Sequence, residues 1–471
     1  MKRLKYYLSF ANPLIPWKTR ICRKYGPGVE ASYDFFAQSQ WWSREQLEAY
    51  QAKKLRKLIC HLYQNLPYYR HLMDSRHLTP NDIRSVKDLN KLPILTKTDI
   101  RANFKDLLSN DFVKERTSLG RTGASTGEPL TFYRDAQSTD AAWGAFFGFA
   151  GWTGFVWGDR MAYFWRTPDS QKNTGTWYQN LIDRLLFEYV SKMRYFDAFK
   201  MSEEYFQGYA ADLRKWQPEL IKAYPSALLY FADYCAKQRI SDIRPKAIIT
   251  TAEPISMSER KALKDVFSCD VFDQYGFGEI FGVSFECEKH EGLHINQTHC
   301  VMEIVDEAGE TIEGTKEGRI IVTDLDNFMM PFVRYDCGDI GSLKDKPCSC
   351  GRGLPMMNHV RGRVFGLIRG VNGNVVHGEF FSDILQDLGW YEAYGLLQFE
   401  VVQRTAEGFK CSFVCSTRPR QSAIDEFIEV CKAQFGEMRI DVNFVASIPL
   451  TTAGKRRNTR SEIDPLRSNT G

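Results

Sequence analysis

Residues 121–130, with the sequence Arg-Thr-Gly-Ala-Ser-Thr-Gly-Glu-Pro-Leu, combine glycines with hydroxyl side chains in one short segment. Glycine lets the backbone approach a ligand closely, and the hydroxyl groups add donors beside exposed backbone N–H groups. A polyphosphate needs many donors and little side-chain bulk, so we predict a phosphate-binding loop that contains Ser125, Thr126 and Gly127. The spacing is not that of a Walker A loop, and a single Ser/Thr/Gly run is also typical of ordinary surface loops.

Five further segments follow in an order that could complete a nucleotide site. Residues 250–254 end a predicted strand, where the backbone could lie against an adenine, and residues 275–279 place an aromatic ring and a carboxylate on a glycine-containing turn. Residues 334–339 carry a carboxylate suited to both hydroxyls of a ribose. Residues 361–363 offer two arginines, and residues 451–457 present a lysine beside a glycine. Each segment alone is typical of an ordinary turn, hinge or tail; their joint order indicates a site.

The elements that must position these segments alternate between strands and helices. The sequence predicts strands at residues 247–250, 301–305 and 319–323, with helices between several of them, such as residues 225–239 and 256–267. This alternation is typical of an α/β architecture with a substantial sheet. Helical periodicity is also clear over residues 43–72 and is predicted for residues 97–108.

A domain boundary is predicted near residues 361–363, because the chain beyond it carries its own set of elements. Two lobes joined there would leave a cleft between them. Arranged β-α-β-β-α-β, the predicted elements would form a compact α+β lobe. They are strands at residues 365–369, 398–403, 411–415 and 440–444, and helices at residues 380–388 and 422–435.

Composition places the chain among globular proteins. Of its 471 residues 43% are hydrophobic and 25% charged, and 62 basic residues nearly balance 58 acidic ones, so nothing favours nucleic acid as a partner. No apolar run has the length needed to cross a bilayer. The basic and apolar residues 1–24 lack the features of a secretory signal, and membrane contact through them would be peripheral at most. Twelve cysteines in such a chain predict reduced thiols and a cytoplasmic protein.

Taken together, the motifs resemble those of the adenylate-forming enzyme superfamily, in the branch of phenylacetate–CoA ligases and their capsular polysaccharide biosynthesis homologues. The segments Asn-Leu-Pro-Tyr-Tyr-Arg at residues 65–70 and Lys-Leu-Pro-Ile-Leu-Thr-Lys at 91–97 extend this resemblance to the N-terminal part. The resemblance implies an α/β fold with a large adenylation domain of mixed sheets and helices, residues 35–361. It also implies a small, mobile α+β C-terminal lobe, residues 362–471, after an extension of residues 1–34.

The resemblance implies a two-step reaction, in which ATP and a carboxylic acid give an acyl-adenylate and pyrophosphate and a thiol then takes the acyl group. Lys455 matches the adenylation lysine, and Glu279 matches the ligand of Mg²⁺. Asp339 matches the ribose-binding carboxylate, which Arg363 is expected to assist. The remaining residues matched to ATP binding are Ser125, Thr126, Gly127, Ala252, Glu253, Pro254, Tyr275 and Gly276.

Three residues depart from the pattern of the family. Ala124 stands where glycine is usual, Glu128 where lysine is common, and Gly366 where the wider superfamily has an acidic hinge residue. Three hypotheses follow: an acyl-CoA ligase, an acyl-activating or acyltransferase component of surface polysaccharide biosynthesis, or a degenerate nucleotide-binding protein. Coenzyme A is the acceptor that the resemblance implies, with an amino sugar or a carrier protein as alternatives, and a homodimer is compatible with it.

A metal site is predicted from cysteine and histidine spacing. Cys348 and Cys350 form a C-x-C-G knuckle, and Cys287 and His294 lie upstream, so the four would complete a Cys₃His set for structural Zn²⁺. Some relatives of this branch carry such a zinc, whereas buried thiols are the simpler alternative. We choose His294 over His290 because it opens an apolar run and is expected to face inward.

The acyl group has two candidate locations. Residues 143–165 are rich in aromatic side chains, which could line an acyl pocket but are more typical of core packing. Residues 225–228 are a pocket-wall candidate by resemblance. Neither identifies the carboxylic acid.

Overall fold

The computed structural model describes residues 28–114, 117–121, 130–165, 192–306, 308–360, 367–448 and 459–462. A nine-stranded sheet lies at its centre, in the order β13-β14-β9-β8-β7-β6-β5-β3-β4. Five neighbouring strands are parallel, and the pairs from β7 to β13 are antiparallel. The strands are β3 (Met161–Trp165), β4 (Met193–Asp197), β5 (Leu220–Ala223), β6 (Ala247–Thr251), β7 (Asp270–Tyr275), β8 (Ser284–Glu286), β9 (Leu293–Ile295), β13 (Leu343–Lys344) and β14 (Met356–Met357).

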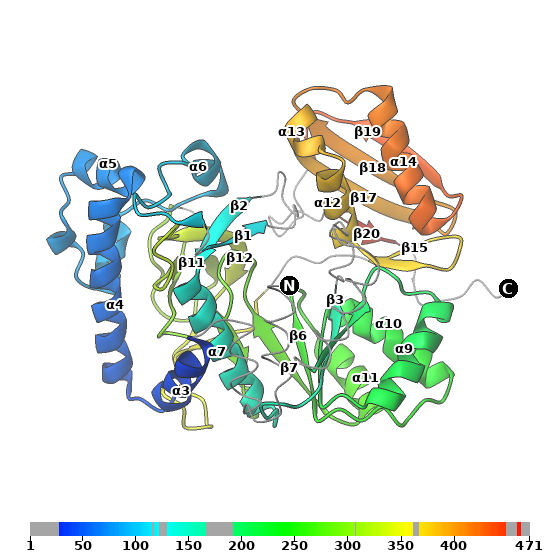
Figure 1. Cartoon of the computed structure of the whole chain (residues 1–471), viewed down its shortest axis with the longest axis horizontal. Coiled ribbons are helices and arrows are strands. Elements are labelled where there is room, and N and C mark those ends of the chain that lie inside the picture. Colours follow the sequence, from blue (N-terminus) through cyan, green and yellow to red (C-terminus); the bar gives the residue numbers. More distant parts are fainter. Residues whose placement is uncertain are drawn as a thin grey trace, which may run out of the picture.

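Helices cover both faces of this sheet (Figure 1). On one face lie α9 (Glu203–Trp216), α10 (Pro225–Lys237) and α11 (Met257–Phe267), and on the other α7 (Ala136–Trp152). The sequence predicted α10 and α11 within a few residues. α11 begins at a capping box, in which the Ser256 side chain accepts a hydrogen bond from the Glu259 N–H and the Glu259 carboxylate accepts one from the Ser256 N–H.

The N-terminal part packs against α7 through α3 (Val29–Ser39). Residues 29–34 of the predicted extension form the first turns of this helix, and Val29 is fully buried. The contact depends on Gly148, because a Cβ there would lie 2.2 Å from a Phe36 ring carbon. The aromatic residues of α7, among them Phe146, Phe147 and Phe149, are buried in the core between α7 and the sheet. Most aromatic residues of the segment 143–165 therefore pack in the core.

The periodic segment of residues 43–72 forms two helices rather than one. α4 (Arg44–Asn65) ends before Pro67, and α5 (Pro67–Ser75) begins at that proline. Proline has no N–H to donate and disfavours a helical conformation in the residue before it, so Leu66 is extended and the helix breaks there. α6 (Lys97–Ala102) is also shorter than predicted.

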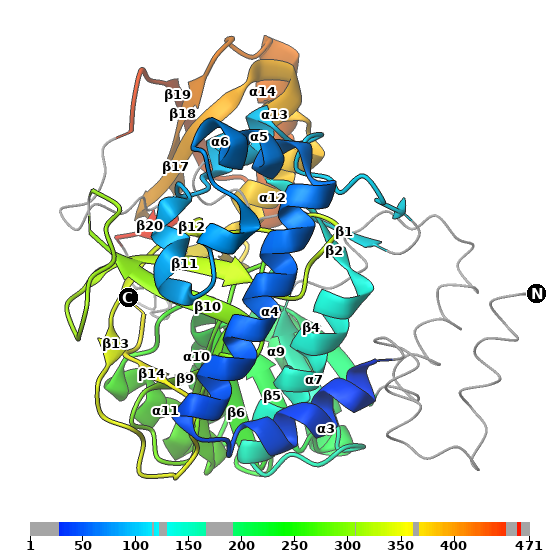
Figure 2. The same cartoon turned by 90° about the vertical axis from the view of Figure 1, so that its left-hand side faces the viewer.

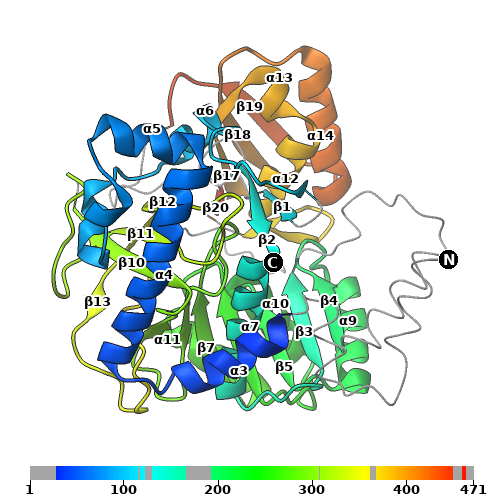
Figure 3. The same cartoon turned by 60° about the vertical axis from the view of Figure 1, so that its left-hand side comes forward.

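α4 lies along a second sheet, in the order β10-β11-β12 (Figures 2 and 3). Its strands are β10 (Cys300–Val305), β11 (Gly318–Asp324) and β12 (Tyr335–Gly341), and its apolar side chains share a core with α4. The hairpin of β1 (Thr117–Arg121) and β2 (Thr131–Asp135) stands above it. The short 3₁₀ helices η1 (Pro80–Asp82) and η2 (Val86–Lys91) complete this part.

The last part of the chain forms a smaller α+β lobe above the large sheet (Figure 1). Its four-stranded sheet has the order β19-β18-β17-β20, and β15 and β16 pair as a separate hairpin that the sequence did not predict as such. The boundary at residues 361–363 lies outside the described residues, so the domain limits stay predictions. The elements are β15 (Leu367–Arg369), β16 (Val375–His377), α12 (Glu379–Asp387), α13 (Trp390–Tyr394), β17 (Leu396–Thr405), β18 (Gly408–Cys415), α14 (Gln421–Phe435), β19 (Arg439–Phe444) and β20 (Thr459–Ser461).

Among the described helices, none combines the length and apolar character that a membrane span requires.

Candidate active site

The carboxyl ends of the parallel strands bring two of the predicted nucleotide-binding segments together. Thr251, the last residue of β6, pairs with Gln274 on β7, so Ala252-Glu253-Pro254 and Tyr275-Gly276 leave the sheet side by side. Ala252 has a φ of +71°, and this left-handed conformation turns the chain sharply after the strand. Open α/β sheets bind ligands at this edge, which makes it the candidate site.

Glu253 is tied to the N-terminus of α10. Its carboxylate accepts hydrogen bonds from the Ser226 backbone N–H and hydroxyl, both at 3.0 Å, and the side chain is buried. A helix N-terminus favours a carboxylate because its free N–H groups carry partial positive charge. Glu253 therefore fixes the segment after β6 to the segment after β5, which gives residues 225–228 a positioning role.

Asp339 and Tyr275 meet although they come from different sheets. The Tyr275 hydroxyl donates to Asp339 Oδ2 at 3.1 Å and lies 3.2 Å from Cys337 Sγ. Burial raises the pKa of Tyr275, as do the neighbouring Cys337 and Asp339. The phenol therefore stays protonated and orients the Asp339 carboxylate, which is only partly buried on β12.

Glu279 lies in the turn after β7 and is buried. Its Oε1 accepts a short hydrogen bond from the Tyr335 hydroxyl on β12. The Arg134 side chain on β2 is partly buried; desolvation lowers its pKa, and the carboxylates of Glu279 and Asp324 oppose that shift. Arg134 Nε has no hydrogen-bond partner among the described residues. The sequence analysis missed Arg134, which follows the phosphate-loop motif within a strand-like run.

Several predicted residues lie outside the described residues: Ser125, Thr126, Gly127, Arg363 and Lys455, together with Ala124, Glu128 and Gly366. The strands on either side of the predicted phosphate loop are placed, because Arg121 on β1 pairs with Thr131 on β2. After Lys455, Thr459 pairs with Val401 on β17 and donates its hydroxyl hydrogen to Gly378 O at 3.1 Å. The roles of these residues stay predictions.

The four predicted zinc ligands come together at the antiparallel end of the large sheet. Their ligand atoms all lie within 4.8 Å of one another. Cys287 Sγ is 3.5 Å from Cys348 Sγ, and His294 Nε2 is 3.4 Å from Cys350 Sγ. Tetrahedral zinc with Zn–S bonds of about 2.3 Å needs ligand separations of about 3.8 Å, so the spacing fits the metal.

The protonation states of this cluster also suit a metal. Burial lowers the pKa of His294 to about 4, which keeps the imidazole neutral, and its Nδ1 lies 3.4 Å from Leu354 O. That carbonyl can accept the Nδ1 proton and leave Nε2 free for a metal. Burial raises the pKa of the Cys287 and Cys348 thiols, so forming their thiolates costs free energy. Binding of a cation to the thiolates would offset that cost. His290 lies instead 3.2 Å from Glu286. The eleven cysteines of the described residues are free of disulfides.

Comparison with known proteins finds relatives that are similar to this chain in sequence. Curated relatives include the phenylacetate-coenzyme A ligases of Thermus thermophilus, with 28% identity over 70% of this chain and 73% of the relative, and of Escherichia coli, with 25% identity over 70% and 74%. Protein CapK of Staphylococcus aureus is 24% identical over 86% of this chain and 87% of its own. No family model matches.

Among solved structures, a 2-hydroxyisobutyryl-CoA ligase in complex with 2-HIB-AMP and CoA has a TM-score of 0.61 at 16% identity, covering 90% of this chain and 91% of its own. The chain therefore shares its fold with this solved ligase, and its sequence is similar to those of phenylacetate-coenzyme A ligases. Its predicted fold class, α/β with a C-terminal lobe, is confirmed. The alignment with the curated phenylacetate-coenzyme A ligases spans 70% of the chain, whereas that with CapK spans 86%.

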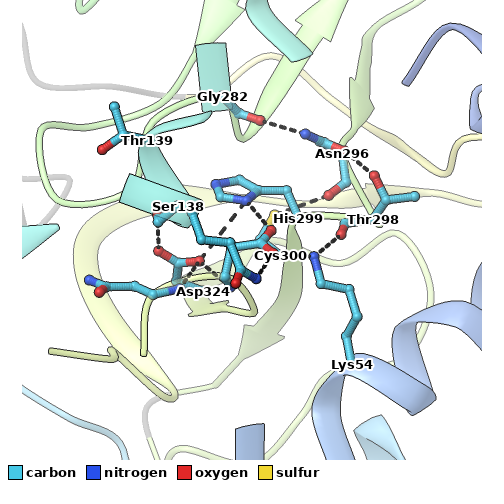
Figure 4. Close-up of polar contacts among 12 residues, drawn as sticks. Lys54, Ser138, Thr139, Gly282, Asn296, Thr298, His299, Cys300 and Asp324 are labelled. Atoms are coloured by element: carbon cyan, nitrogen blue, oxygen red, sulfur yellow. Dashed lines mark hydrogen bonds and ion pairs between the residues drawn. The ribbon is translucent and has the colours of Figure 1, made fainter. Parts of the chain in front are cut away.

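The protein also contains a buried polar cluster that no sequence motif predicted (Figure 4). Lys54 Nζ on α4 lies 2.5 Å from Asp326 Oδ1 and donates to Thr298 O at 2.7 Å. His299 Nδ1 lies 2.8 Å from Asp326 Oδ2 and 4.0 Å from Asp324 Oδ1. The Ser138 hydroxyl of α7 donates to Asp324 Oδ2 at 2.9 Å. The cluster therefore joins α4, α7 and the end of β11.

The cluster is an ion-pair network rather than a second metal site. Its His299, Asp324 and Asp326 have ligand atoms close enough for a cation. However, the Lys54 ammonium already supplies a positive charge against Asp326, and a second cation there would be repelled. Burial favours the neutral imidazole, but the two carboxylates outweigh it and raise the pKa of His299. The pairing is between residues far apart in sequence, which leaves no local signal.

Proposed function

We propose that this protein is an AMP-forming acid–thiol ligase. It activates a carboxylic acid with ATP, giving an acyl-adenylate and pyrophosphate, and transfers the acyl group to a thiol, most simply that of coenzyme A. The observation that carries the proposal is the meeting of separate motifs: Glu253 follows β6, Tyr275 ends the neighbouring β7, and Asp339 on β12 of the second sheet accepts a hydrogen bond from Tyr275. The similarity to phenylacetate-coenzyme A ligases supports it.

The residues have complementary tasks in this proposal. Asp339, oriented by Tyr275, accepts the ribose hydroxyls, and the segment anchored by Glu253 supports the adenine. Glu279 offers a hard oxygen ligand to Mg²⁺, which supplies positive charge against the phosphates when bound. Lys455 neutralises charge as the carboxylate oxygen attacks the α-phosphorus and the bond to pyrophosphate breaks.

Exchange of labelled pyrophosphate into ATP tests the first step. The wild-type protein should catalyse exchange with at least one acid of a panel of aryl and alkyl carboxylic acids. Glu279→Gln should lose exchange by at least about 100-fold, because one charged ligand is removed from a buried site. Glu259→Gln is the matched control, since Glu259 is an exposed capping residue of α11. Nucleotide binding without exchange for every acid would contradict the ligase proposal and favour the degenerate reading.

A second candidate is acyl activation for surface polysaccharide biosynthesis. The similarity to CapK favours it, because that alignment spans 86% of this chain. Mass spectrometry of products distinguishes the two: a CoA thioester supports the ligase, whereas acyl transfer to an amino sugar without a free CoA ester supports the alternative.

We also propose that Cys287, His294, Cys348 and Cys350 hold a structural Zn²⁺. The closed set of four protein ligands leaves no position for a substrate, which is typical of a structural site. Elemental analysis of protein purified without chelators should find about one zinc per chain. Cys348→Ser should lower that content sharply, whereas Cys431→Ser, at a buried thiol of α14, should not. Zinc near zero in the wild-type protein would contradict the site.

The homodimer, the cytoplasmic location and the peripheral membrane contact stay predictions. Light scattering after size exclusion tests the first, cell fractionation the second, and vesicle sedimentation the third.

A further inference from the structure

β5 carries a lysine at a position where its neighbours are apolar. Lys222 is 7% exposed and pairs in register with Tyr163 on β3 and Ile249 on β6. Side chains alternate along a strand, so Lys222 shares a sheet face with Leu220, which packs in the core beneath α7. A long charged side chain is therefore held between the sheet and α7, where burying an unpaired ammonium is costly.

The surroundings of the Lys222 ammonium are aromatic. Its Nζ lies 4.2 Å from the centre of the Phe146 ring and 5.4 Å from that of Phe281. Within the described residues, no carboxylate or other acceptor is found in hydrogen-bond or ion-pair contact with it. Ring faces compensate only part of the lost hydration of an ammonium. Burial lowers the pKa of Lys222 to about 7, so the group titrates near neutral pH.

Lys222 lies close to the candidate active site in sequence and in the sheet. It is four positions before Ser226, which holds Glu253, and Phe281 follows Glu279 by two positions. Gln274, next to Tyr275 on β7, is 4% exposed and lies on the same sheet face as Phe272, which also packs beneath α7. The Gln274 Oε1 atom is buried without a hydrogen-bond partner in the described part of the chain.

These groups share a face that a ligand entering from the sheet edge would meet. β5 and β7 are separated by one strand, and Gln274 lies two residues beyond the position level with Lys222, so their backbones stand about 12 Å apart. The buried Gln274 Oε1 is an acceptor and favours a hydrogen-bond donor. Aromatic rings favour a planar apolar group, while an ammonium favours an oxygen acceptor. A ligand with both features would give the ammonium the counter-charge that the described residues do not supply.

We propose that Lys222 selects the acid: the substrate is an aromatic carboxylic acid with a second oxygen group, a carboxylate or a phenol, at the end remote from the activated carboxylate. This inference rests on the proposed acid activation. The second oxygen group pairs with the Lys222 ammonium, and the ring lies against Phe146 and Phe281. Lys222 takes no part in adenylation and acts as a specificity-determining residue.

The test compares phenylacetic acid with 4-hydroxyphenylacetic and 4-carboxyphenylacetic acids. Equilibrium dialysis with labelled acids measures binding without ATP, and pyrophosphate exchange measures activation. The wild-type protein should prefer both oxygenated acids to phenylacetic acid. Lys222→Met should reduce that preference by roughly 10- to 100-fold, the range for one hydrogen bond to a charged group. Binding of the carboxy acid should weaken as pH rises through about 7, where the Lys222 ammonium deprotonates.

Two controls keep the outcome interpretable. Lys222→Arg retains the charge and should keep part of the preference, whereas Lys246→Met, at an exposed residue paired with Asp159, should change nothing. A preference for phenylacetic acid, a preference unchanged in Lys222→Met, or no binding of either oxygenated acid would overturn the inference. Lys222-dependent binding of the oxygenated acids without exchange would support the role of Lys222 and refute the ligase function. Exchange only with acids that lack the second oxygen group would support the ligase function and overturn the role of Lys222.

Discussion

Replacing Lys54 by Met should destabilise the protein through the buried ion-pair cluster that Lys54 forms with Asp326 and His299. The Lys54 side chain is 16% exposed and its partner Asp326 is 5% exposed, so the substitution leaves a buried carboxylate with one positive neighbour fewer. Removing one partner of a buried pair costs about 3–5 kcal/mol. Because Lys54 keeps some exposure and His299 still faces Asp326, we expect the free energy of unfolding to fall by about 3 kcal/mol.

The destabilisation should depend on pH in a defined direction. In the variant, protonated His299 is the cation left beside Asp324 and Asp326 within the cluster. Its pKa is raised, so its stabilising charge is fully present below about pH 6.5, its unfolded value, and is lost as pH rises through the folded value. The difference between Lys54→Met and wild type should therefore grow above neutral pH.

Differential scanning calorimetry measures this effect. An unfolding entropy of about 2.1 cal/mol/K per residue gives about 1 kcal/mol/K for 471 residues, so Tm should fall by about 3 °C. Lys53→Met is the matched control, since Lys53 is exposed on the same helix. Adding Asp326→Asn to Lys54→Met should recover part of the loss, because the uncompensated charge is removed. A Tm for Lys54→Met equal to that of Lys53→Met would refute the reasoning.

Three further predictions concern the candidate sites. Ser226→Ala removes one of two hydrogen bonds to Glu253. The KM for ATP in pyrophosphate exchange should rise about fivefold with kcat little changed. A fivefold fall in kcat would contradict a positioning role for Ser226. Tyr275→Phe frees Asp339 and should weaken ATP binding by about 1 kcal/mol in calorimetric titration, whereas unchanged affinity would argue against the ribose contact. Cys348→Ser or chelation should lower Tm as zinc is lost, and re-added Zn²⁺ should restore it only where Cys348 is present.

The sequence predicted those parts of the fold whose signals are local. Helices α10 and α11 and strands β6, β10 and β11 match their predicted ranges closely, because periodicity and caps act within a few residues. The cysteine and histidine spacing likewise selected four side chains that the structure brings within 4.8 Å. Pro67 marks the break between α4 and α5, but the leucine periodicity around it predicted one continuous helical segment.

Contacts between residues far apart in sequence could not be predicted. His299 and Lys222 look like an ordinary surface histidine and a strand lysine until the fold buries them. The contact of Tyr275 with Asp339 crosses two sheets, and no spacing rule connects their positions. β15 lies within the predicted strand of residues 365–369, whereas its partner β16 was missed because three residues carry little periodic signal.

The ion pair of Lys54 also constrains how the chain is made. Lys54 donates to the carbonyl of Thr298, 244 residues later, and α4 packs on strands that follow that position. At synthesis rates of about 5–20 residues per second, the ribosome needs roughly 10–50 s to deliver these partners. Throughout that interval the leucine face of α4 has no sheet to cover it. The N-terminal helices are therefore the segment that a chaperone would guard during translation, and they complete their packing only once β10 and β11 have emerged.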